Sequence, residues 1–208
     1  MTLYVPAHFR ADDPETLARF IEANGFATLV SQGAGGLQVS HVPLLAERAQ
    51  DGQLRLLGHV ARANEHWKGL EDAAEVLAIF HGPHAYVSPT WYVNHPSVPT
   101  WNYAVVHARG KARLMEEAEL HDLLMRLSSV YESPNPKPWR MSELPAAYVD
   151  GMLKMIVGFE IEVERLEGKF KLSQNRPAEV ARVIEALEAR GEAGVASLMR
   201  EHAPGAKG

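Results

Sequence analysis

The sequence predicts a mainly β protein of the α+β class, with a closed or nearly closed barrel of about six strands and helices at its flanks. Short apolar runs separated by turn residues recur between residues 26 and 112, with little helical periodicity among them. A further long alternating segment follows at 155–168. Many short strands joined by turns are typical of barrels, whereas a parallel sheet needs helices between successive strands.

A helix is expected over residues 14–24. Asp13 is a favourable N-cap, Pro14 suits the first helical position, and Glu15 places an acid in the first turn. Gly25 then ends the helix, because glycine favours the backbone conformation found beyond a helix C-terminus.

Further helices are expected later in the chain. Leucines at helical spacing predict a helix over 116–132, which the proline-rich loop 133–139 ends. Pro145 begins a short helix, and the tail at about 177–202 has a helical pattern.

Extended segments fill most of the remaining chain. A Gly-rich turn between the first two predicts a hairpin, and 61–72 is expected to form a short helix between two later strands. The extended segments are 26–32, 37–45, 54–60, 75–82, 84–92, 103–112 and 155–168.

Composition narrows the classes of protein. The 208 residues suit a single domain, 1–208, with a C-terminal helical segment, and the absence of cysteine excludes disulfides and thiol chemistry. We expect a soluble cytoplasmic protein without membrane contacts, because no leader pattern or long apolar run occurs. The formal charge of −5 gives no support to binding through phosphate backbones.

Three clusters of polar and aromatic residues are candidates for ligand binding. The first is Trp101 with Asn102, which follow Pro99 and are expected at the mouth of the strand 103–112. These side chains suit a flat ligand. The alternative is a core aromatic beside a turn residue.

The second cluster lies at 169–177, just before a helix expected to begin at Pro177. Cations and amides near a helix N-terminus suit a phosphate or carbonyl-rich ligand, although they also suit a solvated helix entrance. Its members are Lys169, Lys171, Ser173, Gln174, Asn175 and Arg176.

The third cluster, at 58–67, contains His59, Arg62, Asn64 and Trp67. Arginine binds phosphate well, because its planar group offers two parallel donors. The alternative is a surface charge beside an aromatic that covers the core.

Other chemistries lack their sequence patterns. His81 and His84 flank Gly82 and Pro83, which predict a turn, and no carboxylate completes a metal-ligand set. Ser40 and His41 are expected on opposite faces of a strand, which argues against a serine hydrolase. No glycine-rich dinucleotide or P-loop motif occurs.

The chain resembles the PaiB-type FMN-binding proteins, often called negative transcriptional regulators, over nearly its whole length. The motifs that carry this resemblance are MTLYVPAHFRADDPE, GHVARANEHW, IFHGPHAYVSPTWY, VPTWNYAVVHARG, IVGFEIEVERLEGK and KLSQNR. The resemblance implies a split β-barrel related to pyridoxamine-phosphate oxidase and flavin reductases. It also implies a homodimer with FMN in a groove at the subunit interface.

By that resemblance, Arg62 and Lys171 would neutralise the FMN phosphate, and Trp101 would pack on the ring. Asn102 and Gln174 would donate to the ring or the ribityl chain. The full cofactor-binding set expected is His41, His59, Arg62, Asn64, Trp67, Trp101, Asn102, Lys171, Ser173 and Gln174. No catalytic residue and no metal ligand is predicted.

The sequence leaves three functions open. The first is a flavin-dependent regulator or oxidoreductase, in which FMN supplies the chemistry. The second is a transcriptional repressor that acts on DNA directly or through a partner, although no helix-turn-helix or zinc finger is evident. The third is a haem-binding split barrel, since ten histidines offer axial ligands.

Overall fold

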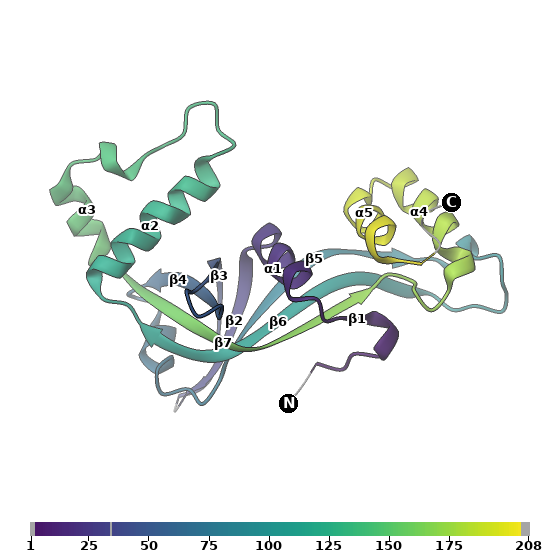
Figure 1. Ribbon diagram of the computed structural model, residues 1–208, viewed down its shortest axis with the longest axis horizontal. Helices are drawn as coiled ribbons and strands as arrows, with labels where there is room; N and C mark the ends of the chain where they lie inside the picture. Colours follow the sequence, from purple (N-terminus) through teal and green to yellow (C-terminus); the bar gives the residue numbers. More distant parts are fainter. Residues whose placement is uncertain (1–2, 34, 205–208) are drawn as a thin grey trace. The chain divides into compact units, whose positions relative to one another are not determined.

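A computed structural model of the chain describes residues 3–33 and 35–204 (Figure 1). The first two residues of the N-terminal motif, Ala34 of the expected hairpin turn and residues 205–208 lie outside the described residues. Within the described residues, the strands are β1 (Arg10–Ala11), β2 (Phe26–Gly33), β3 (Gly36–Arg48), β4 (Leu54–Ala61), β5 (Val76–Val87), β6 (Thr100–Leu114) and β7 (Ile156–Lys171).

Five α-helices and five short 3-10 helices accompany the strands in the described part of the chain. The α-helices are α1 (Pro14–Ala23), α2 (Glu117–Glu132), α3 (Ala146–Leu153), α4 (Val180–Ala189) and α5 (Ala193–His202). The 3-10 helices are η1 (Ala7–Phe9), η2 (Glu65–Gly69), η3 (Pro89–Trp91), η4 (Met141–Glu143) and η5 (Pro177–Glu179). None of the described helices is long and apolar enough to cross a membrane.

The strands follow the order β1-β7-β4-β3-β2-β5-β6, and β7 also pairs with β6. This extra pairing joins two distant members of the order and closes the sheet on itself. β2, β3 and β4 pair with their neighbours in antiparallel register, as Thr28 with His41 and Leu44 with Gly58 show. The predicted fold class, a mainly β barrel with flanking helices, is confirmed.

The chain divides into two compact units, each assembled from separate stretches. Unit 1 comprises Met1–Phe20, Phe80–His107 and Glu167–Gly208, and unit 2 comprises Ile21–Ile79 and Ala108–Leu166. The single domain expected from the sequence stays a prediction. Its C-terminal helical segment corresponds to η5, α4 and α5 of unit 1.

In unit 2, leucines of α2 and α3 pack on β4. The cluster contains Leu57, Leu120, Leu123, Leu127 and Leu153, all buried. Burial of such side chains is the main stabilising contribution, at about 25 cal/mol per Å² of apolar surface. Elsewhere in unit 2, β6 and β7 approach so closely that a Cβ on Gly110 would lie 1.8 Å from the Glu162 carbonyl oxygen.

In unit 1, aromatic contacts join α1 and α5 to β7. The Phe170 ring lies 5.1 Å from that of Phe20 and 5.0 Å from that of His202, centroid to centroid. β1 pairs with β7 through Arg10 and Lys169. Lys169 and Phe170 are neighbours in β7 and therefore point to opposite faces of the strand, because side chains alternate along it.

Most expected elements form within a few residues of their predicted bounds, but the strands around residues 75–112 differ. The expected segments 75–82 and 84–92 form one strand, β5, which ends at Val87 and is followed by the 3-10 helix η3. Gly82 and Pro83 lie inside β5 rather than in a turn, since the missing Cβ of Gly82 leaves room for the Phe20 ring. β6 begins at Thr100, so Trp101 and Asn102 lie within the strand and point to opposite faces. The contact with Phe20 of α1 accounts for a glycine at this strand position, because a Cβ there would come within 2.5 Å of the ring.

Candidate functional site

A groove of about 510 Å³ in unit 1 is the main candidate for a ligand site. Every second residue of β6 from 101 to 107 lines it, as expected when alternate side chains point to one face of a strand. The lining residues are His81, Gly82, His84, Trp101, Tyr103, Ala104, Val105 and His107. The groove therefore combines aromatic surfaces with three imidazoles.

The indole of Trp101 forms an exposed aromatic surface at this groove. Its side chain is 53% exposed although tryptophan is usually well buried. The Tyr86 ring meets the indole edge-on at 6.0 Å between centroids, and the His84 ring lies 6.3 Å away. These neighbours contact the indole, and about half of the residue's surface stays exposed.

Two lysines of β7 contact residues of β6 at or next to the groove. Lys171 Nζ donates to the Trp101 carbonyl oxygen at 2.6 Å and to Thr100 Oγ1 at 2.5 Å. Lys169 Nζ lies 5.5 Å from the centroid of the Tyr103 ring. Burial lowers the pKa of Lys171, and the nearby charge of Lys169 lowers it further. An anion bound beside Lys171 would oppose both effects.

Asn102 points away from Trp101, into the interior of unit 1. It is fully buried, and its Nδ2 donates to Ser173 Oγ at 2.9 Å and to Met199 Sδ at 3.3 Å. Ser173 in turn donates to Asn102 Oδ1 at 3.3 Å. Both side chains thus find their partners within the protein.

Gln174 closes the turn that follows β7. Its Nε2 donates to the Phe170 carbonyl oxygen at 2.6 Å, and its Oε1 accepts from the Leu172 backbone N–H at 2.7 Å. These bonds satisfy backbone groups left by the end of the strand. In this structure, Asn102, Ser173 and Gln174 support the strand ends that carry Trp101 and Lys171.

In unit 2, the turn after β4 contains three other residues of the predicted set: Arg62, Asn64 and Trp67. Arg62 donates to the backbone oxygens of Lys154 and Ile156, at 2.7 and 3.0 Å. Trp67 Nε1 donates to the Arg62 carbonyl oxygen at 3.0 Å, and the guanidinium lies 5.8 Å from the indole centroid. Arg62 therefore connects the turn after β4 to Lys154 and to Ile156, the first residue of β7.

A buried histidine that the sequence analysis did not select lies at the centre of this turn. His66 is 1% exposed, with Nδ1 2.8 Å from Ser40 Oγ and Nε2 2.9 Å from Ser31 Oγ. Asn64 Nδ2 donates to Ser40 Oγ at 2.9 Å. In the neutral ring, one nitrogen donates to a serine hydroxyl and the other accepts from one, so both ring nitrogens are satisfied.

Burial lowers the pKa of His66 and favours this neutral form. Ser31 and Ser40 come from β2 and β3, so the sequence around His66 gives no sign of its partners. Asn64 also accepts from the His66 backbone N–H at 3.1 Å. The network ties η2 to two strands of unit 2.

The remaining predicted histidines differ in their surroundings. His41 is exposed on β3, with Nδ1 3.1 Å from Thr28 Oγ1. His59 on β4 is half-buried, and its Nδ1 has no hydrogen-bond partner among the described residues. Burial lowers the pKa of His59. A buried polar atom without a partner is uncommon in proteins and marks a place where a ligand could supply one.

The structure thus distributes the predicted set over both units. Trp101, Asn102, Lys171, Ser173 and Gln174 belong to unit 1, and His41, His59, Arg62, Asn64 and Trp67 belong to unit 2. Their roles toward a cofactor stay predictions. Among the described residues, no group of three or more His, Asp or Glu side chains is arranged to hold a metal ion.

Comparison with solved structures defines the class of protein. The chain matches the FAD- and haem-binding protein of Mycobacterium smegmatis with a TM-score of 0.59 and 14% identity, covering 78% of this chain and 73% of that one. It matches the flavocytochrome Anf3 of Azotobacter vinelandii with a TM-score of 0.57 and 16% identity, covering 80% and 72%. At these identities the likeness concerns the fold, and the chain is a split β-barrel protein.

Sequence comparison identifies the family. Residues 3–165 match the family model described as "Putative FMN-binding domain". The chain is 37% identical over 187 residues to the protease synthase and sporulation protein PAI 2 of Bacillus subtilis, covering 89% of each. It is 34% identical over 174 residues to an uncharacterised protein of Emericella nidulans, covering 66% of this chain and 69% of that one. The chain belongs to this FMN-binding domain family, and the resemblance to PaiB-type proteins is confirmed.

Proposed function

We propose that this protein binds FMN, with the flavin ring against the indole of Trp101 in the groove of unit 1. One observation carries the proposal: an aromatic groove borders a lysine in a chain of the FMN-binding domain family. The groove volume of about 510 Å³ lies within the range of roughly 300–1,000 Å³ typical of ligand pockets.

The groups around the groove fit FMN chemically. Its flat ring needs an aromatic or apolar face, which Trp101 supplies with its exposed indole. Its ring edge needs hydrogen-bond donors, which the imidazoles of His84 and His107 can provide. Its phosphate needs a cation, and Lys171 has three N–H groups of which two donate to protein oxygens.

The chemistry would come from the bound flavin, which transfers hydride or single electrons. The chain's own residues hold and orient it: Trp101 covers one face of the ring, and Lys171 neutralises the phosphate. Asn102 supports the site without contacting the flavin, because its buried hydrogen bonds to Ser173 fix the strand that carries Trp101. We propose a flavin-dependent regulator or oxidoreductase of the cytoplasm.

We also propose a homodimer with FMN at the subunit interface. The support is the exposure of Trp101 and Tyr86, large side chains that a second copy would cover together with a flat ligand. Sedimentation in the presence and absence of FMN tests this part of the proposal. A monomer that retains FMN at micromolar protein concentration would contradict it.

Titration with FMN and with riboflavin, followed by quenching of flavin fluorescence, tests the cofactor proposal. We expect FMN to bind more tightly, because riboflavin lacks the phosphate that Lys171 contacts. Lys171→Gln should weaken FMN binding by roughly 10- to 100-fold, the effect of a hydrogen bond to a charged group, and should leave riboflavin binding unchanged. Lys111→Gln is the matched control, because Lys111 is an exposed residue of the neighbouring strand β6 and does not line the groove.

Two outcomes would contradict this assignment. Equal binding of FMN and riboflavin by the unaltered protein would show that no cation contacts the phosphate. Equal losses in Lys171→Gln and Lys111→Gln would show a general electrostatic effect in place of a specific contact. Circular dichroism of each variant confirms that the fold is retained.

A further inference from the structure

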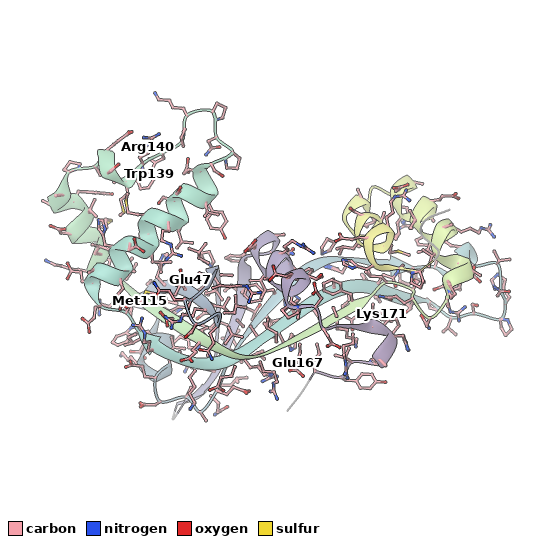
Figure 2. All side chains as sticks on the ribbon, viewed as in Figure 1. Glu47, Met115, Trp139, Arg140, Glu167 and Lys171 are labelled. Carbon is pink, nitrogen blue, oxygen red and sulfur yellow. The ribbon has the colours of Figure 1, made fainter. Side chains whose placement is uncertain are left out.

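Two further cavities lie in unit 2, within the segment that joins β6 to β7. A cavity of about 270 Å³ lies among α2, η4 and α3, and one of about 390 Å³ lies beside it along the C-terminal part of α2. They share the lining residues Ser128, Trp139 and Met141 and therefore adjoin; together we call them the α2–α3 trough. Figure 2 labels Trp139 and Arg140 in the loop between α2 and α3.

One end of the trough is apolar. Leu124 of α2 faces Val149 and Leu153 of α3 across it. At its rim, the Trp139 and Met152 side chains are each 48% exposed. Large apolar side chains left half exposed around a concave surface mark a binding site more often than scattered exposed residues do. Methionine adapts its shape to varied apolar ligands.

The other end of the trough is polar and carries a cation. Arg140 lines it and forms no side-chain hydrogen bond or ion pair with any described residue. The hydroxyls of Ser129 and Ser142 line it too, and neither has a partner in the described chain. One guanidinium and two hydroxyls are donors suited to a carboxylate.

Glu132 also lines the polar end, but its carboxylate is already engaged. Oε2 accepts from the Trp139 backbone N–H at 3.0 Å and from Asn135 Nδ2 at 2.7 Å. These bonds lower the pKa of Glu132 and keep it charged. Glu132 therefore fixes the loop that positions Trp139, and its charge, which neutral N–H donors do not cancel, offsets part of the positive charge of Arg140 at this end.

We propose that the α2–α3 trough binds a small amphipathic organic acid. The apolar body lies between α2 and α3, against Trp139, and the carboxylate lies at Arg140 with Ser129 and Ser142. The apolar cavity of about 270 Å³ falls just below the range of roughly 300–1,000 Å³ for drug-sized ligands, so the body is smaller than these. The proposal is independent of flavin binding, because it uses none of the groove residues.

A small acid fits these observations better than a protein partner or a second copy. A protein surface would bury the exposed rim, but it has no need of a cavity behind that rim. An apolar helix laid on the trough would also leave Arg140 without a counter-charge. The division into an apolar end and a cationic end matches a molecule with a hydrocarbon body and one acidic group.

The probe for the test is 4-phenylbutyrate, with 4-phenylbutan-1-ol as its neutral counterpart. Both are titrated into the full chain, and indole N–H resonances are followed by two-dimensional NMR. The chain has four tryptophans, and a Trp139→Phe variant assigns the resonance of Trp139. We expect saturable shifts of the Trp139 resonance with the acid and weaker binding of the alcohol.

Calorimetry with matched variants tests the role of the cation. Arg140→Gln should weaken binding of the acid about fivefold, as expected for an exposed charge pair, and leave binding of the alcohol unchanged. Lys137→Gln removes an exposed charge from the same loop outside both cavities, and it should change neither. Val149→Phe, which fills the apolar end, should weaken both compounds.

Several results would overturn the proposal. They are the absence of saturable Trp139 shifts at millimolar acid, shifts confined to the other tryptophans, and equal affinity for acid and alcohol. A dimer that protects the Trp139 indole N–H from solvent exchange would assign the trough to a second copy instead. A loss of acid binding in Lys137→Gln equal to that in Arg140→Gln would show that the loss reflects the net charge of the loop and not a specific contact with Arg140.

Discussion

Asn102 and Ser173 hydrogen-bond each other in the interior of unit 1, although 71 positions separate them in the sequence. The Asn102 side chain is fully buried, and Ser173 has a positive φ of 68°. A non-glycine residue with positive φ is uncommon and needs surrounding contacts to hold it. This pair therefore fixes the end of β7 beside the strand that carries Trp101.

Asn102→Ala should destabilise the protein by about 2 kcal/mol, because the buried Ser173 hydroxyl loses its partner and a small cavity forms. Urea unfolding followed by circular dichroism measures the change in the free energy of unfolding. Asn135→Ala, in an exposed loop, is the control and should cost less than about 1 kcal/mol. Unchanged stability of Asn102→Ala with lost FMN binding would instead place Asn102 in direct contact with the flavin.

Two substitutions of Ser173 separate its backbone conformation from its hydroxyl. Ser173→Ala and Ser173→Gly both remove the hydrogen bond to Asn102, but glycine adopts a positive φ without strain. We expect the glycine variant to be the more stable of the two by roughly 0.5–1 kcal/mol, as judged from urea midpoints. An alanine variant as stable as the glycine variant would mean that the backbone at 173 relaxes.

Trp101→Ala should weaken FMN and riboflavin binding to a similar degree, about tenfold, because the indole contacts the ring that both share. Trp101→Phe should retain part of the affinity. Trp91→Ala provides the control, since Trp91 lies outside the groove and contacts Arg190. Flavin fluorescence titrations give the dissociation constants. A loss with FMN alone would show that Trp101 acts through the phosphate.

The buried His66 makes stability dependent on pH. Burial lowers its pKa in the folded state, so the unfolded chain binds the proton more readily. The free energy of unfolding should therefore fall as pH drops below about 6.5, by at most about 1.4 kcal/mol per pH unit from this group, until the folded pKa is passed. Urea unfolding between pH 8 and pH 5 measures this slope.

His66→Gln isolates that contribution from those of the other histidines. The variant should be less stable than the unaltered protein at pH 8, where the bonds to Ser31 and Ser40 are intact, by about 1–2 kcal/mol. The difference should narrow toward pH 5, because glutamine does not titrate. A constant difference across this range would show that His66 does not control the pH dependence.

Local pattern predicted most of the elements because their signals are local. Asp13, Pro14 and Gly25 bound a helix that forms at Pro14–Ala23, and the leucines of 116–132 lie on the buried face of α2. Gly82 was misjudged for a different reason. Glycine and proline usually mark turns, but here both lie in β5, and Gly82 packs so closely on the Phe20 ring that a Cβ would come within 2.5 Å of it.

The sequence also predicted only part of the candidate site. Their residue types made Trp101 and Lys171 candidates, and the structure shows that Lys171 donates to the Trp101 carbonyl oxygen. The sequence did not indicate His66, because its partners Ser31 and Ser40 lie 35 and 26 positions away. Asn102 shows the converse. Its identity suggested a ligand contact, and its burial beside Ser173 gives it protein partners.

The sequence by itself determined the fold class, the family and the residue types available for binding a phosphorylated aromatic molecule. These follow from alternation, turn residues and long motifs, which are properties of neighbouring positions. Only the tertiary structure decided which face of each strand is solvent-exposed and which polar groups satisfy one another. Those outcomes depend on contacts between distant segments, and a one-residue change in strand register would exchange the two faces.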